Sequence, residues 1–285
     1  MRRHIRLASL TSVLLAGCRD GSKSGEAAGR IADVPGTIAT ADQDQRALPA
    51  PNAVLSLGSA ADTGVAGYRA VRDTASLHGG SLSGRIETTH PVSGDTAIAP
   101  THDLGVCKPF TETTLPSSRG GVGNAVVWLV GVSTGPAVTA PRRASLILDR
   151  CRLNPRVQVI ARRATLLVTS RDAMMSRLRF VDQAHATTVR AQVAFNDAGQ
   201  VVPTSAVAAA PGLVEVRDDQ HPWVRAWIAV APHPFVTVSD EDGRYEFESV
   251  PPGVYTLVVW QERLGTQSRT VRVEPGIATK VVIAY

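Results

Sequence analysis

The 285-residue sequence has few aromatic side chains, few cysteines and no long apolar run after its N-terminus. Because no internal stretch reaches about 18 consecutive apolar residues, a membrane-spanning helix is excluded after the N-terminus. Almost no segment shows a sustained helical period, which excludes a helical class. The length suits one large domain or two ordinary ones. The remaining pattern is one of short alternating segments separated by Gly and Pro, which predicts an all-β protein.

The N-terminus has the pattern of an export signal. A positive segment containing Arg2, Arg3 and Arg6 precedes a short apolar stretch, Leu7 to Ala16. This order predicts a signal peptide over residues 1–17.

The residues Leu15-Ala16-Gly17-Cys18 resemble the bacterial lipobox. In that family the cysteine is lipidated, so Cys18 is expected to carry a lipid and to make the bilayer a partner. The alternative is an ordinary secretory signal in which Cys18 is incidental. Arg19 stands where a retention signal reads Asp, and the resemblance then favours the outer membrane. The expected location is the bacterial cell envelope, at the periplasmic face of the outer membrane or the cell surface.

Export places the remaining two cysteines in an oxidising compartment. Cys107 and Cys151 form an even pair, so a structural disulfide is the expected use. The alternative is a catalytic or metal-binding thiol, which lacks a His or Cys partner at ligand spacing. Residues 18–77 are rich in Ala, Gly, Ser, Asp and Pro, which predicts a mostly disordered tether between lipid and domain, with a short helix or strand within Val54 to Val71 as the alternative.

The stretch from Phe235 to Trp260 carries the strongest turn signals of the chain. Asp242-Gly243 and Pro251-Pro252-Gly253 separate short β-prone runs, and aromatic and acidic residues alternate between these turns. Here the sequence resembles the carboxypeptidase regulatory-like domain, a small transthyretin-like β-sandwich. The residues that carry the resemblance are Asp240, Gly243, Tyr245, Phe247, Pro251, Pro252, Gly253, Tyr255 and Leu257.

A transthyretin-like sandwich has about seven strands, but only five are expected from Phe235 onward. The alternating segment 81–87 and the apolar segment 124–130 can supply the other two. We therefore expect a split sandwich, residues 78–144 plus 231–285, with a second module of residues 145–230 inserted into it. The rival is a simple tandem of the two modules. Pairing of the 81–87 strand with the insert would reject the split.

The inserted module resembles a cupredoxin. The resemblance rests on Cys151-Arg152-Leu153-Asn154-Pro155, on the strand 164–168 and on the loop Asp218-Asp219-Gln220-His221-Pro222-Trp223-Val224. In that family, His, Cys, His and Met bind copper. This chain has Ser176 and Asp218 in place of the first His and the Cys, and Val224 in place of the Met. Only His221 is kept.

Blue copper needs a thiolate and two imidazoles, so the resemblance implies a degenerate site without metal or other cofactor. A carboxylate and an imidazole are two ligands, which rarely fix an ion. We expect His221 to pack on Trp223 or to accept a backbone hydrogen bond.

Gly131-Val132-Ser133-Thr134-Gly135 matches the nucleophile-elbow pattern, but the prolines at 136 and 141 prevent the helix that this motif needs. We expect a turn there and no catalytic residue. His233 lies between two prolines and is interpreted as structural.

Charge is unevenly distributed, although the net charge is only +5. Residues 141–190 contain eleven Arg and three Asp, whereas residues 211–250 contain eight acidic residues and three Arg. The pattern fits solvated or mutually attracting faces, or a basic face for an anionic envelope polymer. An exported protein is not expected to bind nucleic acid.

These patterns predict a non-enzymatic envelope lipoprotein whose β-sandwich modules bind a protein or glycan or serve assembly. The alternatives are a periplasmic copper or electron-transfer protein, which would need the missing ligands, and a carbohydrate-binding protein, which would need exposed aromatic residues.

Overall fold

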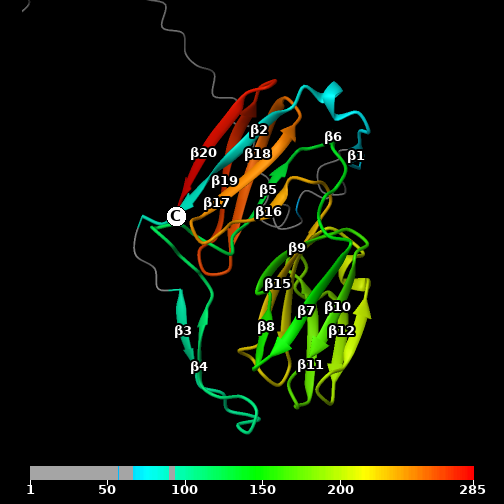
Figure 1. Cartoon of the computed structure of the whole chain (residues 1–285), viewed down its shortest axis with the longest axis vertical. Coiled ribbons are helices and arrows are strands. Elements are labelled where there is room, and N and C mark those ends of the chain that lie inside the picture. Colours follow the sequence, from blue (N-terminus) through cyan, green and yellow to red (C-terminus); the bar gives the residue numbers. More distant parts are fainter. Residues whose placement is uncertain (1–56, 58–66, 90–93) are drawn as a thin grey trace, which may run out of the picture. The chain divides into compact units, whose positions relative to one another are not determined.

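The computed structural model describes Leu57, residues 67–89 and residues 94–285. Strands and connecting loops make up nearly all of this part (Figure 1). Its helices are two short 3₁₀ turns, η1 (Thr74–Leu77) and η2 (Ala206–Ala208), and the described residues contain no helix long and apolar enough to cross a bilayer. The predicted all-β class is confirmed. The expected signal peptide, Cys18 and most of the expected tether lie outside the described residues.

Seven strands form one sandwich, which we call the host. One sheet has the order β17-β2-β20, and the other has the order β16-β5-β18-β19. The bounds are β2 (Gly80–Glu87), β5 (Val126–Val130), β16 (Val236–Val238), β17 (Arg244–Val250), β18 (Gly253–Gln261), β19 (Gly265–Val273) and β20 (Ala278–Ala284). β2 pairs with β17 and β20, and β5 pairs with β16 and β18. Two segments of the chain therefore build the host, and the 81–87 strand pairs with C-terminal strands.

The residues between these two segments form a second sandwich, which we call the insert. Its sheets have the orders β12-β11-β14-β15-β9 and β13-β10-β7-β8. The bounds are β7 (Arg143–Asp149), β8 (Arg152–Asn154), β9 (Val157–Ala161), β10 (Thr165–Ser170), β11 (Ser176–Asp182), β12 (Val189–Phe195), β13 (Val201–Thr204), β14 (Gly212–Asp218) and β15 (Arg225–Ala231). The insert thus starts and ends within two residues of 145 and 230.

Three strands, β5, β15 and β18, have long apolar runs because both of their faces are buried. In β5, alternate residues enter the host core and a third cluster that also contains insert residues. β18 does the same, while β15 divides its side chains between the insert core and this third cluster. The third cluster includes Trp128, Trp227 and Trp260, and the rings of Trp227 and Trp260 lie 4.6 Å apart. A strand with one exposed face alternates apolar and polar residues. A strand with both faces buried has few exposed positions, so most of its residues are apolar.

Two short strand pairs lie outside the sandwiches. β3 (Asp95–Ile98) and β4 (Phe110–Thr113) form a hairpin, and β1 (Arg69–Ala70) pairs in parallel with β6 (Thr134–Gly135). β1 lies in the segment 54–71, where a short helix or strand was the alternative to a tether. η1 shows that residues 74–77, at the end of the predicted tether, are also structured.

A turn forms at Asp242-Gly243 where it was predicted, but the flanking strands do not form a hairpin, because β16 pairs with β5 and β17 pairs with β2. Gly243 has φ +78°, and a Cβ at this position would lie 2.1 Å from the carbonyl oxygen of Ile86. Gly is required there both for the left-handed backbone and for the close approach of β2.

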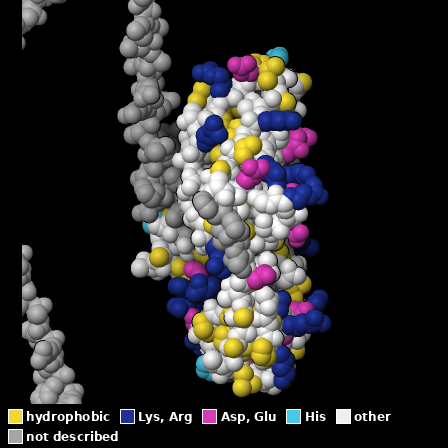
Figure 2. All heavy atoms as spheres, turned by 90° about the vertical axis from the view of Figure 1, so that its left-hand side faces the viewer, with side chains coloured by type: hydrophobic (Ala, Val, Ile, Leu, Met, Phe, Trp, Pro, Cys, Tyr) yellow, Lys and Arg dark blue, Asp and Glu magenta, His cyan; other side chains and the backbone are white. Residues whose placement is uncertain are grey.

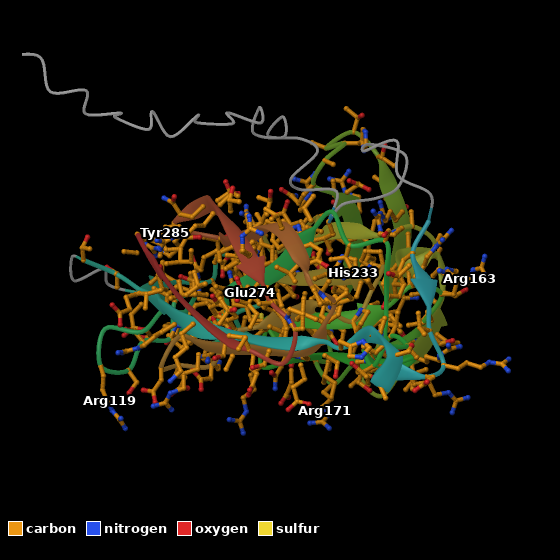
Figure 3. All side chains as sticks on the ribbon, turned by 90° about the horizontal axis from the view of Figure 1, so that it is seen from above. Arg119, Arg163, Arg171, His233, Glu274 and Tyr285 are labelled. Atoms are coloured by element: carbon orange, nitrogen blue, oxygen red, sulfur yellow. A yellow bond between two sulfur atoms is a disulfide. The ribbon has the colours of Figure 1, made fainter. Side chains whose placement is uncertain are left out.

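His233, in the loop between β15 and β16, is buried; it is labelled in Figure 3. Its Nδ1 accepts a hydrogen bond from the backbone N–H of Phe235 at 3.3 Å, and its ring lies 5.8 Å from that of Tyr68. Burial lowers the pKa of His233 from 6.5 to about 4, because desolvation penalises the charged ring more than nearby backbone carbonyls favour it.

This shift predicts a loss of stability in acid. The unfolded chain takes up a proton at His233 near pH 6.5, whereas the folded chain resists it until about pH 4. Stability present above pH 6.5 is therefore lost as the pH falls towards 4. We expect wild type to lose about 3 kcal/mol more between pH 7 and pH 4 than His233→Asn, whose side-chain oxygen can replace Nδ1 as acceptor. Urea unfolding at several pH values measures this, and equal losses would refute the assignment.

Candidate functional site

The four positions that the sequence resemblance assigns to a degenerate metal site lie where strands of the insert begin or end. Ser176 starts β11, Asp218 ends β14, and the loop that holds His221 and Val224 leads into β15. β11 and β14 pair with Leu178 opposite Asp218, which brings Ser176 beside the loop. Ser176, His221 and Val224 are completely buried, and Asp218 is nearly so.

The Asp218 carboxylate organises the loop by accepting hydrogen bonds at both oxygens. Oδ1 accepts the backbone N–H groups of Gln220 at 2.7 Å and His221 at 3.0 Å. Oδ2 accepts the Ser176 hydroxyl and the backbone N–H of Arg177, the latter at 3.2 Å. A buried carboxylate is tolerated when such donors surround it.

His221 lies between two carboxylates. Its Nδ1 is 3.2 Å from Asp218 Oδ1, and its Nε2 is 2.8 Å from Asp103 Oδ2. The Trp223 ring meets the imidazole edge-on at 5.4 Å. The ring can donate to both carboxylates only when both nitrogens carry protons. The expected packing on Trp223 is present, but the ring's polar partners are carboxylates instead of the backbone.

Val224 closes the loop through its backbone. Its N–H donates to the carbonyl of His221 at 2.8 Å, and its carbonyl accepts the N–H of Asp218 at 3.2 Å. The side chain belongs to the insert core and offers no ligand atom.

These residues do not fit a copper ion. Asp218 accepts at both oxygens, and both nitrogens of His221 face carboxylates, so a metal would have to break a buried hydrogen-bond network. Ser176 and Val224 supply neither imidazole nor thioether. Among the described residues, no group of three or more His, Cys, Asp or Glu side chains is arranged to hold a metal ion.

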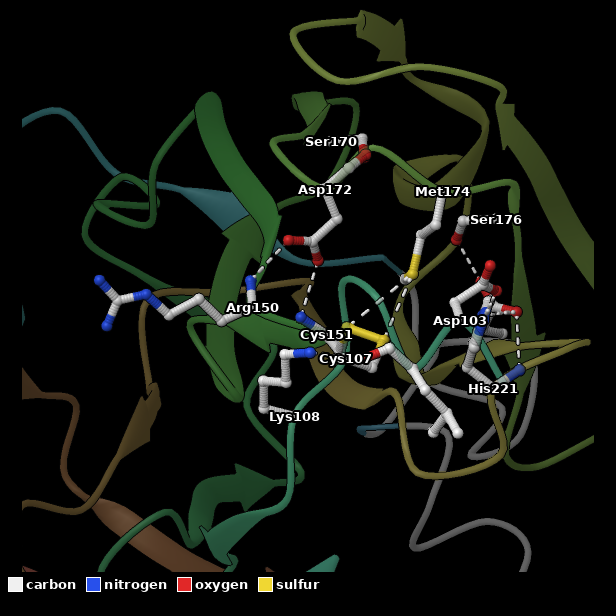
Figure 4. The surroundings of a disulfide bond; sticks show 12 residues. Asp103, Cys107, Lys108, Arg150, Cys151, Ser170, Asp172, Met174, Ser176 and His221 are labelled. Atoms are coloured by element: carbon white, nitrogen blue, oxygen red, sulfur yellow. Dashed lines mark hydrogen bonds and ion pairs between the residues drawn. A yellow bond between two sulfur atoms is a disulfide. The ribbon is translucent and has the colours of Figure 1, made fainter. Parts of the chain in front are cut away.

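The Cys107–Cys151 disulfide lies close to this network (Figure 4). Cys107 belongs to the loop between β3 and β4, and Cys151 belongs to the turn between β7 and β8. The bond therefore attaches the hairpin loop to the insert. The sulfur of Met174 lies 3.5 Å from the Cys107 sulfur and 3.9 Å from that of Cys151, so this Met packs on the disulfide.

Two aspartates that complete this region were not predicted. Asp172 accepts the backbone N–H groups of Arg150 at 2.8 Å and Cys151 at 2.7 Å, and these two residues have positive φ. Asp172 thus holds the turn that presents Cys151. Asp103 comes from the β3–β4 loop, 118 residues from its partner His221. No sequence spacing could reveal such a contact.

Asp103 offers a direct test of the network. Asp103→Ala leaves the buried Nε2 of His221 without its partner, so we expect the free energy of unfolding to fall by about 1–3 kcal/mol. Asp149→Ala is the matched control, because both carboxylates are 43% exposed but Asp149 makes only a 3.9 Å ion pair with the exposed Arg171. Its expected cost is below about 1 kcal/mol. Urea unfolding measures both, and equal costs would contradict the role of Asp103.

The fold defines the class: an all-β protein of two sandwiches, in which hydrogen bonds link Ser176, Asp218 and His221. Residues 188–285 match the family model of the carboxypeptidase regulatory-like domain. The predicted resemblance to that family is thereby confirmed over this part of the chain. The match covers β12 to β20, so it includes the last strands of the insert and the five C-terminal strands of the host, but not β2 and β5.

Solved structures with partial similarity include cupredoxins. A purple cupredoxin from Nitrosopumilus maritimus has 15% identity and a TM-score of 0.25, with 31% of this chain and 99% of that chain covered. Auracyanin from Roseiflexus castenholzii has 16% identity and a TM-score of 0.26, with 33% and 99% covered. The TIE protein of Bacillus anthracis has 7% identity and a TM-score of 0.17, with 72% and 50% covered. No curated protein matches the sequence.

Proposed function

We propose that the protein is a non-enzymatic, lipid-anchored β-sandwich scaffold of the cell envelope, which binds or assembles other envelope components. The observation that carries the proposal is the hydrogen-bond network of Asp218 and His221. It occupies the place where the cupredoxin resemblance would put chemistry, and it consumes the polar groups of that place. The hydrogen-bond donors and acceptors of this site are paired with one another. Such a network favours a structural role over a catalytic one.

The alternatives have less support. Copper transfer needs ligands that Ser176 and Val224 do not provide. Glycan binding through stacked aromatic rings needs exposed Trp side chains, whereas three of the four Trp are buried and Trp223 is half-buried against His221. Ser133 is the residue that the nucleophile-elbow pattern would make the nucleophile of a hydrolase. It lies in the turn before β6, where its carbonyl accepts the N–H of Arg69.

The experiment is expression of wild type and Cys18→Ala in a bacterial host, followed by membrane fractionation and mass spectrometry of the N-terminal peptide. We expect wild type in the membrane fraction with a lipid on Cys18 and the variant released from it. Equal release of both proteins would refute the anchor. Metal-dependent electron transfer or turnover by the purified protein would refute the scaffold.

A further inference from the structure

The arginines of the insert divide into paired and unpaired groups. Arg156, Arg171, Arg179 and Arg190 each form an ion pair with a carboxylate. On the face shown in Figure 2, basic side chains likewise lie near acidic ones. The two Arg-Arg dipeptides of the insert, 142–143 and 162–163, form no ion pair with any described residue, and all four side chains are exposed.

The fold places these dipeptides side by side. β7 and β10 run parallel with Arg143 opposite Thr165, and the carbonyl of Arg142 accepts the N–H of Thr165 at 2.9 Å. The carbonyl of Pro141 accepts the N–H of Ala161 at 2.9 Å. Arg162 and Arg163 form the tight turn between β9 and β10, and Figure 3 shows Arg163 at the periphery. We call these four residues the arginine cluster.

No acidic residue interrupts the segments that meet at the cluster. Residues 136–148, 157–171, 205–211 and 226–235 contain no Asp or Glu. The next arginine in this region, Arg190, is occupied by Asp182 and by the carbonyls of Val207, Ala210 and Pro211. The cluster is therefore a local concentration of positive charge without a compensating partner among the described residues.

We propose that the arginine cluster is a docking surface for the phosphate groups of an anionic lipid bilayer. Guanidinium groups bind phosphate oxygens in a bidentate manner, and four of them on long side chains suit an extended surface better than one small ion. The choice of a bilayer rests on the proposed function, because an anchor at Cys18 would hold the cluster near lipid at high effective concentration. Docking would then fix the orientation of the sandwiches on the membrane.

The test uses the full chain carrying Cys18→Ala, so that binding is not due to the anchor. Co-sedimentation with vesicles of phosphatidylcholine containing phosphatidylglycerol is compared with vesicles of phosphatidylcholine alone. Each arginine near an anionic surface contributes about fivefold to partitioning. We expect Arg162→Gln/Arg163→Gln to weaken binding to the anionic vesicles about 25-fold, and the variant with all four replaced to abolish it.

The matched control is Arg177→Gln/Arg272→Gln, which removes the same charge from two exposed arginines elsewhere. It should weaken binding less than about fivefold. An equal loss in the control, no binding of the parent to anionic vesicles, or binding to a soluble anionic polysaccharide but not to vesicles would each overturn the cluster as a bilayer site. Lipidation of Cys18 in the fractionation experiment together with no vesicle binding would reject this inference and leave the proposed anchor intact.

Discussion

Replacing both Cys107 and Cys151 by Ala is expected to lower the free energy of unfolding by about 4 kcal/mol. The bond closes a loop of 44 residues, and a crosslink of this length restricts the unfolded chain strongly. Both residues are buried, and they join the β3–β4 loop to the insert. Without the disulfide, we therefore expect the β3–β4 loop to detach from the insert and the contact between Asp103 and His221 to break.

Urea unfolding of wild type and the Cys107→Ala/Cys151→Ala variant measures the effect. Wild type kept reduced with a thiol reagent is the control and should unfold at the same urea concentration as the variant. Limited proteolysis should cut the variant first in the β3–β4 loop. A loss below about 1 kcal/mol, or unchanged proteolysis of this loop, would show that other contacts fix the loop.

Replacing Arg156 by Met is expected to cost about 3–5 kcal/mol, because among the described residues the buried Glu262 would keep only a hydrogen bond from the Trp227 Nε1–H, and Glu112 would keep only a 3.8 Å ion pair with Arg152. Arg156 belongs to the insert, and it forms a two-bond ion pair with Glu262 at 2.7 and 2.8 Å and a third bond with Glu112 at 2.9 Å. The side chains of all three are at most 13% exposed. Burial lowers the pKa of Arg156, but the hydrogen bond and charge of Glu262, followed by those of Glu112, outweigh it and leave the pKa above its usual value.

Two matched variants separate pairing from packing. Arg171→Met removes an exposed arginine whose ion pair with Asp149 spans 3.9 Å, and should cost less than about 1 kcal/mol. The triple variant Arg156→Met/Glu112→Gln/Glu262→Gln removes the stranded charges and should recover most of the loss. Arg156 lies in the insert, and Glu262 lies between the host strands β18 and β19. Equal losses of stability for Arg156→Met and Arg171→Met would mean that the ion pairs of Arg156 do not hold host and insert together.

Local chemistry made the host predictable. Turns at Gly243 and at Pro251-Pro252, with alternating aromatics between them, depend on the backbone limits of a few neighbouring residues. The disulfide could be predicted because only two cysteines remained after Cys18. The strands β11 and β12 were missed, although in β11 the buried Leu178 and Phe180 alternate with Arg177 and Arg179 as expected for a half-buried strand.

Contacts between distant segments made the rest unpredictable. Asp103 reaches His221 only because the β3–β4 hairpin crosses to the insert, and Arg156 meets Glu262 across 106 residues. Leu57 lies in a stretch expected to be tether, yet its side chain is completely buried in the cluster shared by host and insert. Neither composition nor period distinguishes such residues from solvent-exposed ones.

The most direct measurement is the visible absorption of the purified full chain during titration with Cu²⁺, with metal content determined after gel filtration. Because Asp218 and His221 are held by protein hydrogen bonds, we predict no intense visible band and no copper retained in proportion to protein. An intense band, or one retained copper per chain that is lost in His221→Gln, would contradict the account that hydrogen bonds within the protein occupy Asp218 and His221.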